Sequence, residues 1–416
     1  MTDRFIDILD DARSASIVLA RTTTAAKNEA LEAIALALLA HTDRIVEANA
    51  LDLDRAERDG MEAGLVDRLR MTNDRVNALA SAVRDIIAIP DPIGEVIRES
   101  TLPNGLELSQ IRVPFGVVGA IYEARPNVTV DLAAILLKSG NAAVLRGGSA
   151  AEQTNTVLVD VIGAALESVG LPRAIVQSID EFGRDGATRL MNARGYVDVL
   201  VPRGSATLIN AVVNDSSVPV IETGAGVVHI FLDETAELEM ANDIVHNAKT
   251  QRVGVCNALE TLLVHRDSAH RLLPTILGRL DASGVTIHAD ERAGAEFPGT
   301  QPATESDWGH EYLSMDVAVK VVDSLDDAIE HIRKHSTQHT DSIITNDPEN
   351  AERFLNEVDS AVVMVNASTR FTDGGEFGFG AEVGISTQKL HARGPMGLPE
   401  LTSTKWIVRG NGQWRR

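Results

Sequence analysis

The chain contains one cysteine, Cys256, which lies in a polar, glycine-containing segment, residues 250–260, between a helical stretch and an apolar strand-like stretch. A structural cysteine more often lies inside an apolar helix or strand. A nucleophilic cysteine needs an accessible sulfur and a nearby cation or helix terminus that favours the thiolate. The segment fits a catalytic nucleophile, and a structural thiol stays open as the alternative. One cysteine excludes an intrachain disulfide and a Cys-rich zinc site.

A nucleotide site has only a weak signature. The chain has no G-x-x-x-x-G-K-[ST] loop, and Gly224-Ala225-Gly226 is not a complete G-x-G-x-x-G motif. Gly204 and Ser205 follow a predicted strand and open a predicted helix, where free N–H groups would face a phosphate. A simple strand-to-helix turn with Ser205 as the N-cap explains the same residues.

Three histidines, His331, His335 and His339, recur at intervals of four residues. On a helix they would share one face, which is a pattern that some metal sites use. Because no carboxylate is fixed nearby by spacing, we interpret them as packing residues and expect no metal.

Hydrophobic periodicity predicts helices over residues 24–90, which end at Ile89-Pro90-Asp91-Pro92. Asn104-Gly105 lies between two short extended runs and predicts a hairpin over 101–108. Since an isolated two-stranded ribbon is only marginally stable, this hairpin must pack on another element, and a neighbouring subunit is one possibility.

Two blocks then alternate strand and helix patterns, which is typical of parallel sheets covered on both faces. In such sheets ligands bind beyond the carboxyl ends of the strands. In the first block we expect strands at 117–122, 142–145, 197–201 and 218–221, and helices at 129–139, 151–169 and 205–214. In the second we expect strands at 228–232, 259–264, 317–322, 342–344 and 361–365, and helices at 236–249, 267–281, 325–335 and 348–357. The glycine-rich tail ends in a short extended run at 405–408.

The composition is that of a globular protein, with 416 residues, 44% hydrophobic and 24% charged, which indicates two or three domains. The net charge of −22 argues against a nucleic-acid partner but does not exclude a small anionic substrate, because a local arginine pair can override the overall field. The apolar runs are shorter than the ~18 residues of a membrane span, and the N-terminal residues do not resemble a signal peptide. We therefore expect a cytoplasmic protein with no membrane partner.

Several stretches together resemble one family. The chain is similar to the gamma-glutamyl phosphate reductases, the proline-biosynthetic members of the aldehyde dehydrogenase superfamily, over roughly residues 110–400. The stretches that carry the resemblance are 114–119, 122–129, 144–149, 247–252 with Cys256-Asn257, 328–332, 335–341, 366–371, 384–387 and 391–397.

The resemblance implies an aldehyde dehydrogenase-like α/β fold, with a doubly wound nucleotide-binding domain, a second α/β catalytic domain and a small oligomerisation ribbon. It implies a homo-oligomer, with the active site in the cleft between the two large domains. The implied boundaries are 1–98 and 114–226 for the NADP-binding domain, 227–390 for the catalytic domain that carries Cys256, and 99–113 with 391–416 for the ribbon and tail.

The resemblance also implies a reaction, the reduction of L-glutamyl 5-phosphate by NADPH to L-glutamate 5-semialdehyde with release of phosphate. Cys256 matches the nucleophile that would carry the thioester. Asn127 matches the asparagine that stabilises the oxyanion, although from the sequence alone it reads as a turn residue after Pro126. Glu222 matches the general base of hydrolytic relatives; because a reductase has no water step, we interpret it as site-lining or structural.

The cofactor implied is NADP. Glu311 matches the glutamate that binds the nicotinamide ribose, and Arg146 with Ser149 would bind the adenosine ribose or the 2′-phosphate. Gly204 and Ser205 would face a phosphate of the same cofactor.

Arg370 and Arg393 are the candidates for the anionic groups of the substrate, with ordinary surface arginines as the alternative reading. Glutamate 5-kinase is a possible partner, since it would deliver the unstable acyl phosphate. The nearest competing functions are another NAD(P)-dependent aldehyde dehydrogenase and a catalytically silent nucleotide-binding protein.

Overall fold

The structure is a computed structural model that describes residues 3–415. These residues form two compact units. Unit 1 holds residues 3–222, 378–384 and 396–415, and unit 2 holds residues 223–377 and 385–395. Both units contain a parallel sheet with helices, so the predicted α/β class is confirmed. Among residues 3–415, no helix combines the length and apolar character that crossing a bilayer requires.

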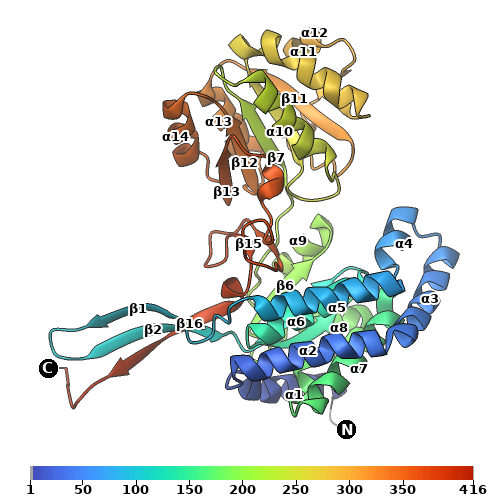
Figure 1. Ribbon diagram of the computed structural model, residues 1–416, viewed down its shortest axis with the longest axis vertical. Helices are drawn as coiled ribbons and strands as arrows, with labels where there is room; N and C mark the ends of the chain where they lie inside the picture. Colours follow the sequence, from blue (N-terminus) through green and yellow to red (C-terminus); the bar gives the residue numbers. More distant parts are fainter. Residues whose placement is uncertain (1–2, 416) are drawn as a thin grey trace. The chain divides into compact units, whose positions relative to one another are not determined.

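Unit 1 begins with a series of helices that precede its first strand (Figure 1). They are α1 (Arg4–Leu19), α2 (Thr24–Ala40), α3 (Thr42–Arg58), α4 (Ala63–Leu69) and α5 (Asn73–Ala88). Side-chain oxygens of Thr23 and Thr72 cap α2 and α5, each accepting a hydrogen bond from a backbone N–H of the first turn. The helices predicted from residue 24 onward are confirmed, whereas α1 was not predicted.

The sheet of unit 1 has four parallel strands in the order β5-β4-β3-β6, a pattern that requires crossover helices. The strands are β3 (Val117–Tyr122), β4 (Ala142–Arg146), β5 (Val176–Ser178) and β6 (Val199–Arg203), and the helices are α6 (Pro126–Lys138), α7 (Glu152–Ser168), α8 (Gly183–Met191) and α9 (Ala206–Asp215). The strand predicted at 218–221 makes only an isolated bridge between Leu200 and Val220. Pro219 has no N–H to donate, so a continuous ladder cannot form there.

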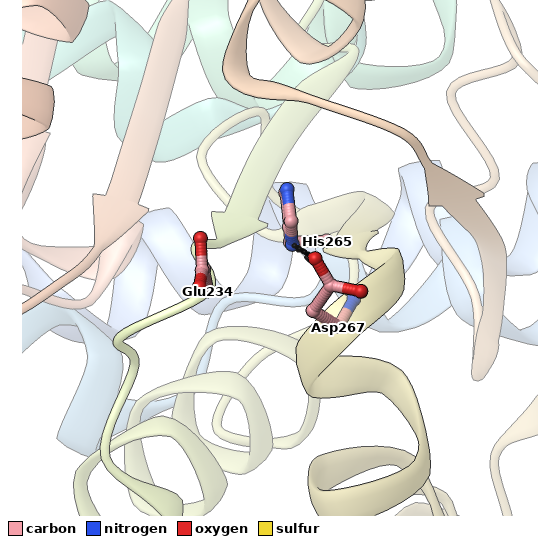
Figure 2. Close-up of side chains that lie close together, drawn as sticks. All are labelled: Glu234, His265 and Asp267. Carbon is pink, nitrogen blue, oxygen red and sulfur yellow. Dashed lines mark hydrogen bonds and ion pairs between the residues drawn. The ribbon is translucent and has the colours of Figure 1, made fainter.

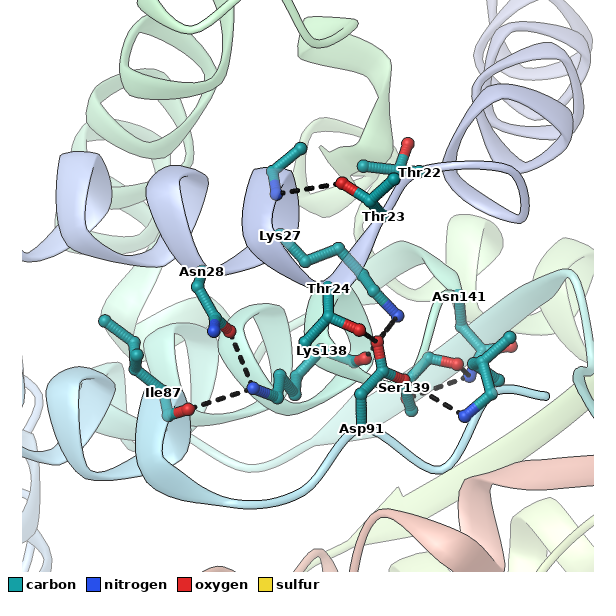
Figure 3. Close-up of polar contacts among 12 residues, drawn as sticks. Thr22, Thr23, Thr24, Lys27, Asn28, Ile87, Asp91, Lys138, Ser139 and Asn141 are labelled. Carbon is teal, nitrogen blue, oxygen red and sulfur yellow. Dashed lines mark hydrogen bonds and ion pairs between the residues drawn. The ribbon is translucent and has the colours of Figure 1, made fainter. Parts of the chain in front are cut away.

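A buried charge cluster joins α2 and α6 to the turn after α5 (Figure 3). Lys27 and Lys138 are both 1% exposed. Nζ of Lys27 lies 2.5 Å from a carboxylate oxygen of Asp91, and Nζ of Lys138 donates to the Asn28 side chain at 2.6 Å and the Ile87 carbonyl at 3.0 Å. Burial lowers the pKa of Lys138, and Asp91 opposes that shift. The Asp91 carboxylate thus forms an ion pair with Lys27, and its charge also favours the protonated form of the buried Lys138.

The hairpin predicted at Asn104-Gly105 is confirmed. Its strands, β1 (Val96–Thr101) and β2 (Glu107–Pro114), lie beside β16 (Thr402–Arg409) in an antiparallel sheet of order β1-β2-β16 (Figure 1). Gly105 has a φ of +83°, a conformation that glycine adopts without strain. Side chains at both edges of this ribbon are exposed, including Trp406 at 49% and Val408 at 55%.

Unit 2 is built on a seven-stranded parallel sheet of order β10-β9-β11-β8-β7-β12-β13. Ile230 and Leu232 of β7 face one hydrophobic core, whereas Phe231 between them faces a second, so helices cover both faces. The strands are β7 (Val228–Leu232), β8 (Leu259–His265), β9 (Thr286–Ala289), β10 (Gln301–Pro302), β11 (Asp316–Val322), β12 (Thr340–Ile344) and β13 (Val362–Val365), and the helices are α10 (Leu238–Thr250), α11 (Arg266–Ala282), α12 (Glu291–Glu296), α13 (Leu325–His335) and α14 (Pro348–Glu357). The tail adds β14 (Gly384–Ser386) and β15 (Gly394–Met396), which pair as a two-stranded sheet.

Candidate functional site

Cys256 lies in the loop between α10 and β8 and is half-buried. The next residue, Asn257, fixes this loop: its amide donates to the carbonyl of Thr372 at 2.8 Å, and its own carbonyl accepts from the Thr369 hydroxyl at 2.8 Å. The loop precedes β8, so the thiol is at the amino edge of the sheet in unit 2. This differs from the general expectation that ligands bind at the carboxyl ends of parallel strands.

Gly226 brings a second segment against this loop. A Cβ on Gly226 would lie 1.5 Å from the carbonyl oxygen of Cys256, so only glycine fits this approach. The Gly226 N–H donates to Oε1 of Glu311 at 2.7 Å. Burial raises the pKa of Glu311, although the Gly226 hydrogen bond opposes that shift. Two residues of the predicted site, Cys256 and Glu311, are thereby joined through one glycine.

The segment that carries Glu311 is held by a buried ion pair. The N–H of Leu313, a residue with a φ of +53°, donates to Oε1 of Glu260 at 3.2 Å. Glu260 and Lys249 are both fully buried, and their charged atoms lie 2.8 Å apart. Burial raises the pKa of Glu260, and the Lys249 ammonium opposes this. A paired carboxylate in the core therefore positions the backbone that follows Glu311.

Arg370 lies close to the thiol. Its Nε donates to Oε1 of Gln251 at 2.8 Å. Burial lowers the pKa of Arg370, the neighbouring Arg252 adds to that, and the Cys256 thiolate acts in the opposite direction. The guanidinium group of Arg370 is thus close enough to both Arg252 and the Cys256 sulfur for their charges to shift its pKa. Arg370 lines a small cavity of about 180 Å³ together with Asn247, Gln251, Phe371, Asp373 and Glu376.

Arg252 and Gln251 were not predicted as site residues. The available signal was their position in the loop that also contains Cys256. Arg393, which was predicted, has a different environment. Its Nη2 donates to the carboxylate of Asp359 at 2.9 Å and to the Asp359 carbonyl at 3.0 Å, and Lys389 pairs with the same carboxylate. A role for Arg393 toward the substrate stays a prediction.

Asn127 belongs to unit 1 and is exposed at the second position of α6. Pro126 fits the first position, where no N–H is needed. The Asn127 amide donates to the Asp131 carboxylate one turn later, at 3.1 Å. Burial raises the pKa of Asp131 to about 6, while Asn127 and Arg203 favour its ionised form. The asparagine thus presents an amide at an exposed helix start, next to a largely buried acid.

Four of the five residues predicted to bind a dinucleotide, Arg146, Ser149, Gly204 and Ser205, lie at the carboxyl edge of the sheet in unit 1, whereas the fifth, Glu311, belongs to unit 2. Arg146 ends β4, its Nε donates to the Gly183 carbonyl at 3.3 Å, and Ser149 is exposed three residues later. At the start of α9, the Ser205 N–H donates to Oε1 of Glu123 at 2.8 Å.

Ser205 also caps α9, since its hydroxyl accepts from the Leu208 N–H. A Cβ on Gly204 would lie 2.7 Å from the side chain of Glu123. The carboxylate of Glu123 therefore occupies the helix start where a phosphate was expected, and a cofactor phosphate at this position would have to displace it.

His331 and His335 belong to α13, whereas His339 lies beyond the end of that helix and is fully buried, so the three histidines do not share one helix face. His331 is on α13, with its ring centroid 4.5 Å from that of His335 and 5.6 Å from that of buried His229. Burial lowers the pKa of His331 to about 2 and that of His339 to about 4, so both rings are neutral.

Across residues 3–415, one group of three side chains, Glu234, His265 and Asp267, has the spacing of metal ligands (Figure 2). Nδ1 of His265 accepts the Asp267 N–H at 3.2 Å as the cap of α11, and Glu234 and Asp267 are exposed. The hydrogen bond accounts for the orientation of His265 without an ion.

Comparisons with known proteins place the chain in a family. The model of the aldehyde dehydrogenase family matches residues 2–294. A curated relative, gamma-glutamyl phosphate reductase of Leifsonia xyli subsp. xyli, is 65% identical over 415 residues, which cover 100% of this chain and 98% of the relative. The corresponding protein of Clavibacter michiganensis is 63% identical, over 99% of this chain and 96% of the relative.

The chain belongs to the gamma-glutamyl phosphate reductases of the aldehyde dehydrogenase family. It is thus a member of an oxidoreductase family, as the sequence indicated. The crystal structure of gamma-glutamyl phosphate reductase from Thermotoga maritima is similar over 100% of both chains, with a TM-score of 0.98 and 45% identity. An acetylating aldehyde dehydrogenase from Geobacillus thermoglucosidasius, 18% identical with a TM-score of 0.71 over 99% of this chain and 98% of that one, shows the shared fold alone. The predicted aldehyde dehydrogenase-like fold is therefore confirmed.

Proposed function

We propose that this protein reduces L-glutamyl 5-phosphate to L-glutamate 5-semialdehyde with NADPH and releases phosphate, as a step of proline biosynthesis in the cytoplasm. The similarity to full-length gamma-glutamyl phosphate reductases supports the substrate. The observation that carries the proposal is the position of Cys256, half-buried in a loop fixed by Asn257 and Gly226 and within electrostatic range of Arg370.

The Cys256 thiolate would attack the acyl carbon of the substrate, forming the S–C bond as the C–O bond to phosphate breaks. Hydride addition to the thioester carbon gives the alkoxide of a thiohemiacetal, and its collapse breaks the C–S bond and releases the aldehyde and the Cys256 thiolate. Arg370 and Arg252 would stabilise both the thiolate and the leaving phosphate, because a guanidinium pairs with a phosphate through two parallel hydrogen bonds. Asp373 and Glu376 line the same cavity as Arg370. Their negative charges would repel an anion that does not reach the two arginines.

Both steps place negative charge on the former carbonyl oxygen. We assign the stabilisation of that charge to the amide of Asn127 and the backbone N–H of Cys256. One preorganised donor of this kind lowers a barrier by ~3 kcal/mol. Asp131 fixes the amide orientation, since it accepts a hydrogen bond from Asn127 Nδ2.

NADPH supplies the hydride. Glu311 would bind the nicotinamide ribose through its carboxylate, and Arg146 with Ser149 would bind the 2′-phosphate. The donor types suit that group, because Arg146 ends β4 and the exposed Ser149 follows three residues later, so that a guanidinium and a hydroxyl both follow the carboxyl end of this strand. Gly204 and Ser205 would meet a cofactor phosphate once Glu123 has moved away from the Ser205 N–H.

We further propose a homo-oligomer that forms through the ribbon and tail, residues 99–113 and 391–416, and an association with glutamate 5-kinase. The exposed apolar side chains of this sheet, among them Val96, Trp406 and Val408, support an interface there.

The test is the reverse reaction, in which glutamate semialdehyde, phosphate and NADP⁺ are supplied and NADPH formation is followed. The wild type should require phosphate, should prefer NADP⁺ over NAD⁺, and should lose at least ~10³-fold in rate as Cys256→Ser. Thermal melting checks that the variant is folded. Unchanged activity of Cys256→Ser would overturn the covalent mechanism, and activity without phosphate would overturn the proposed substrate.

A further inference from the structure

The segment 336–341 leads from α13 into β12 at the amino edge of the sheet in unit 2, the edge that also carries the Cys256 loop. The proposed reaction assigns none of its residues a role. Asp341 anchors the segment, because its buried carboxylate accepts hydrogen bonds from the Ser336 hydroxyl at 3.0 Å and from the His229 N–H at 3.0 Å. The segment therefore has a fixed position from which it can support the neighbouring loop.

Thr340 supports the nucleophile loop through the residue that follows the thiol. Its hydroxyl donates to the Thr372 hydroxyl at 3.0 Å, and the Thr372 carbonyl accepts from the Asn257 amide at 2.8 Å. All three residues are buried, so water cannot easily replace these bonds. Since Arg370 belongs to the short turn that ends at Thr372, the same bonds fix Arg370 relative to the Cys256 loop.

Thr337 supports the segment that packs against the same loop. Its hydroxyl accepts a hydrogen bond from the N–H of Val227 at 3.0 Å. Val227 is buried and directly follows Gly226, whose N–H donates to Glu311 and whose backbone lies against the Cys256 carbonyl. Loss of the Thr337 hydroxyl would leave the Val227 N–H without this partner, which favours a shift of the backbone that holds Glu311.

We propose that Thr337 and Thr340 are positioning residues for the nucleophile site. Thr340 sets the position of Arg370 relative to the Cys256 thiol, whereas Thr337 sets the position of Glu311. The inference rests on the proposed function, because that function gives Arg370 and Glu311 their roles. The two hydroxyls act on different groups, so their removal has different consequences.

Steady-state kinetics of the reverse reaction tests the role of Thr337. Thr337→Val should raise the KM for NADP⁺ about tenfold, because the displaced Glu311 no longer meets the nicotinamide ribose. Thr340→Val should change this KM less than about threefold. Thr337→Ser keeps the hydroxyl and should restore the KM to within about threefold of the wild-type value.

Alkylation of the single cysteine tests the role of Thr340 without turnover. Iodoacetate carries a carboxylate that a guanidinium attracts, whereas iodoacetamide is neutral. Because both reagents react with the same thiolate, the ratio of their rate constants reports the position of Arg370 and not the ionisation of Cys256. Relative to free cysteine, Thr340→Val should lower this ratio at least about fivefold, whereas Thr340→Ser and Thr337→Val should keep it within about twofold of the wild type.

Thr372→Val removes the other end of the same hydrogen bond and should lower the alkylation ratio as Thr340→Val does, so it replaces that variant if thermal melting shows that Thr340→Val is unfolded. Thr345→Val is the matched structural control. Thr345 is 2% exposed, and its hydroxyl donates to the Asp233 carboxylate at 2.6 Å at the carboxyl edge of the same sheet. This variant should lose thermal stability but keep both the KM and the alkylation ratio within about twofold.

Two results would overturn the inference. One is an equal change of both readouts in Thr337→Val and Thr340→Val, and the other is the same change in Thr345→Val, since each shows a general loss of packing. If the alkylation ratios follow the expected pattern but the wild type has no phosphate-dependent activity, the proposed function fails and the positioning of Arg370 by Thr340 stands. Unchanged alkylation ratios in both Thr340→Val and Thr372→Val would overturn the role of Thr340 even in a fully active enzyme.

Discussion

The backbone of Gly226 lies directly against the peptide of Cys256, so that a Cβ at position 226 would lie 1.5 Å from the Cys256 carbonyl oxygen. The N–H of the same glycine donates to Glu311. The nucleophile loop and the proposed ribose-binding glutamate therefore depend on one residue that has no side chain, and a change there must displace at least one of them.

Gly226→Ala should abolish most activity and destabilise unit 2. The added methyl group meets backbone atoms, which cannot rotate away, so we expect a loss of about 1–3 kcal/mol in the free energy of unfolding and a fall in kcat of at least ~100-fold. Chemical denaturation and the reverse assay measure both. Gly278→Ala, in mid-helix and with its nearest neighbour at 3.8 Å, is the control and should be neutral or stabilising. Wild-type activity in Gly226→Ala would show that the loop position does not matter for catalysis.

Ser149→Glu should weaken the preference for NADP⁺ over NAD⁺. A carboxylate beside Arg146 would repel the 2′-phosphate of NADP⁺ and accept hydrogen bonds from the free ribose of NAD⁺. The ratio of kcat/KM for NADP⁺ over NAD⁺ should fall at least about tenfold. Thr156→Glu adds the same charge on the exposed side of α7 and should leave the ratio unchanged. An unchanged ratio in Ser149→Glu would place the 2′-phosphate elsewhere.

Asp91→Asn should destabilise unit 1 strongly. The substitution leaves the ammonium groups of Lys27 and Lys138 buried without a carboxylate, which costs about 3–5 kcal/mol in the free energy of unfolding. Asp67→Asn removes the carboxylate of an exposed ion pair with Arg75 and should cost less than about 1 kcal/mol. Urea denaturation compares the two. Equal small losses would show that the buried lysines find other partners or lose their protons.

Glu222→Gln distinguishes reduction of an acyl phosphate from hydrolytic aldehyde oxidation. If the thioester is resolved by phosphate or by hydride, no general base is needed, and the rate of the phosphate-dependent reaction should change less than about threefold. Aldehyde oxidation that uses water would lose ~10³-fold. Assays with and without phosphate separate the two, and a large loss in both would make Glu222 a catalytic base.

Much of the fold was predictable, because strands buried on both faces read as apolar runs with defined ends. β7 was predicted with the bounds that the structure shows, and Asn104-Gly105 identified its hairpin. The signal for α1 was available but sparse: Phe5, Leu9 and Ala12 bury one face, and three aspartates lie among them. β9 was missed because its four residues alternate between buried and half-buried.

The sequence allowed the residues of the candidate site to be identified, but it did not allow the contacts between them to be predicted. Cys256 and Glu311 were both identified, yet their connection through Gly226 depends on how three distant segments pack, which no local spacing records. Gly226 was considered only as part of an incomplete nucleotide motif, whereas the structure requires its glycine for close backbone approach. The Glu123 carboxylate at the Ser205 N–H was likewise invisible in the sequence, because it joins two strand ends.

The thioester on Cys256 can be detected directly. The protein is mixed with glutamate semialdehyde and NADP⁺ without phosphate, quenched, and analysed by intact mass and peptide mapping. We expect one glutamyl group per subunit on the peptide that contains Cys256, one equivalent of NADPH, release of the adduct when phosphate is added, and neither product in Cys256→Ser. Since the chain has a single cysteine, the assignment is unambiguous. Phosphate-dependent turnover without any adduct on Cys256 would contradict the covalent mechanism.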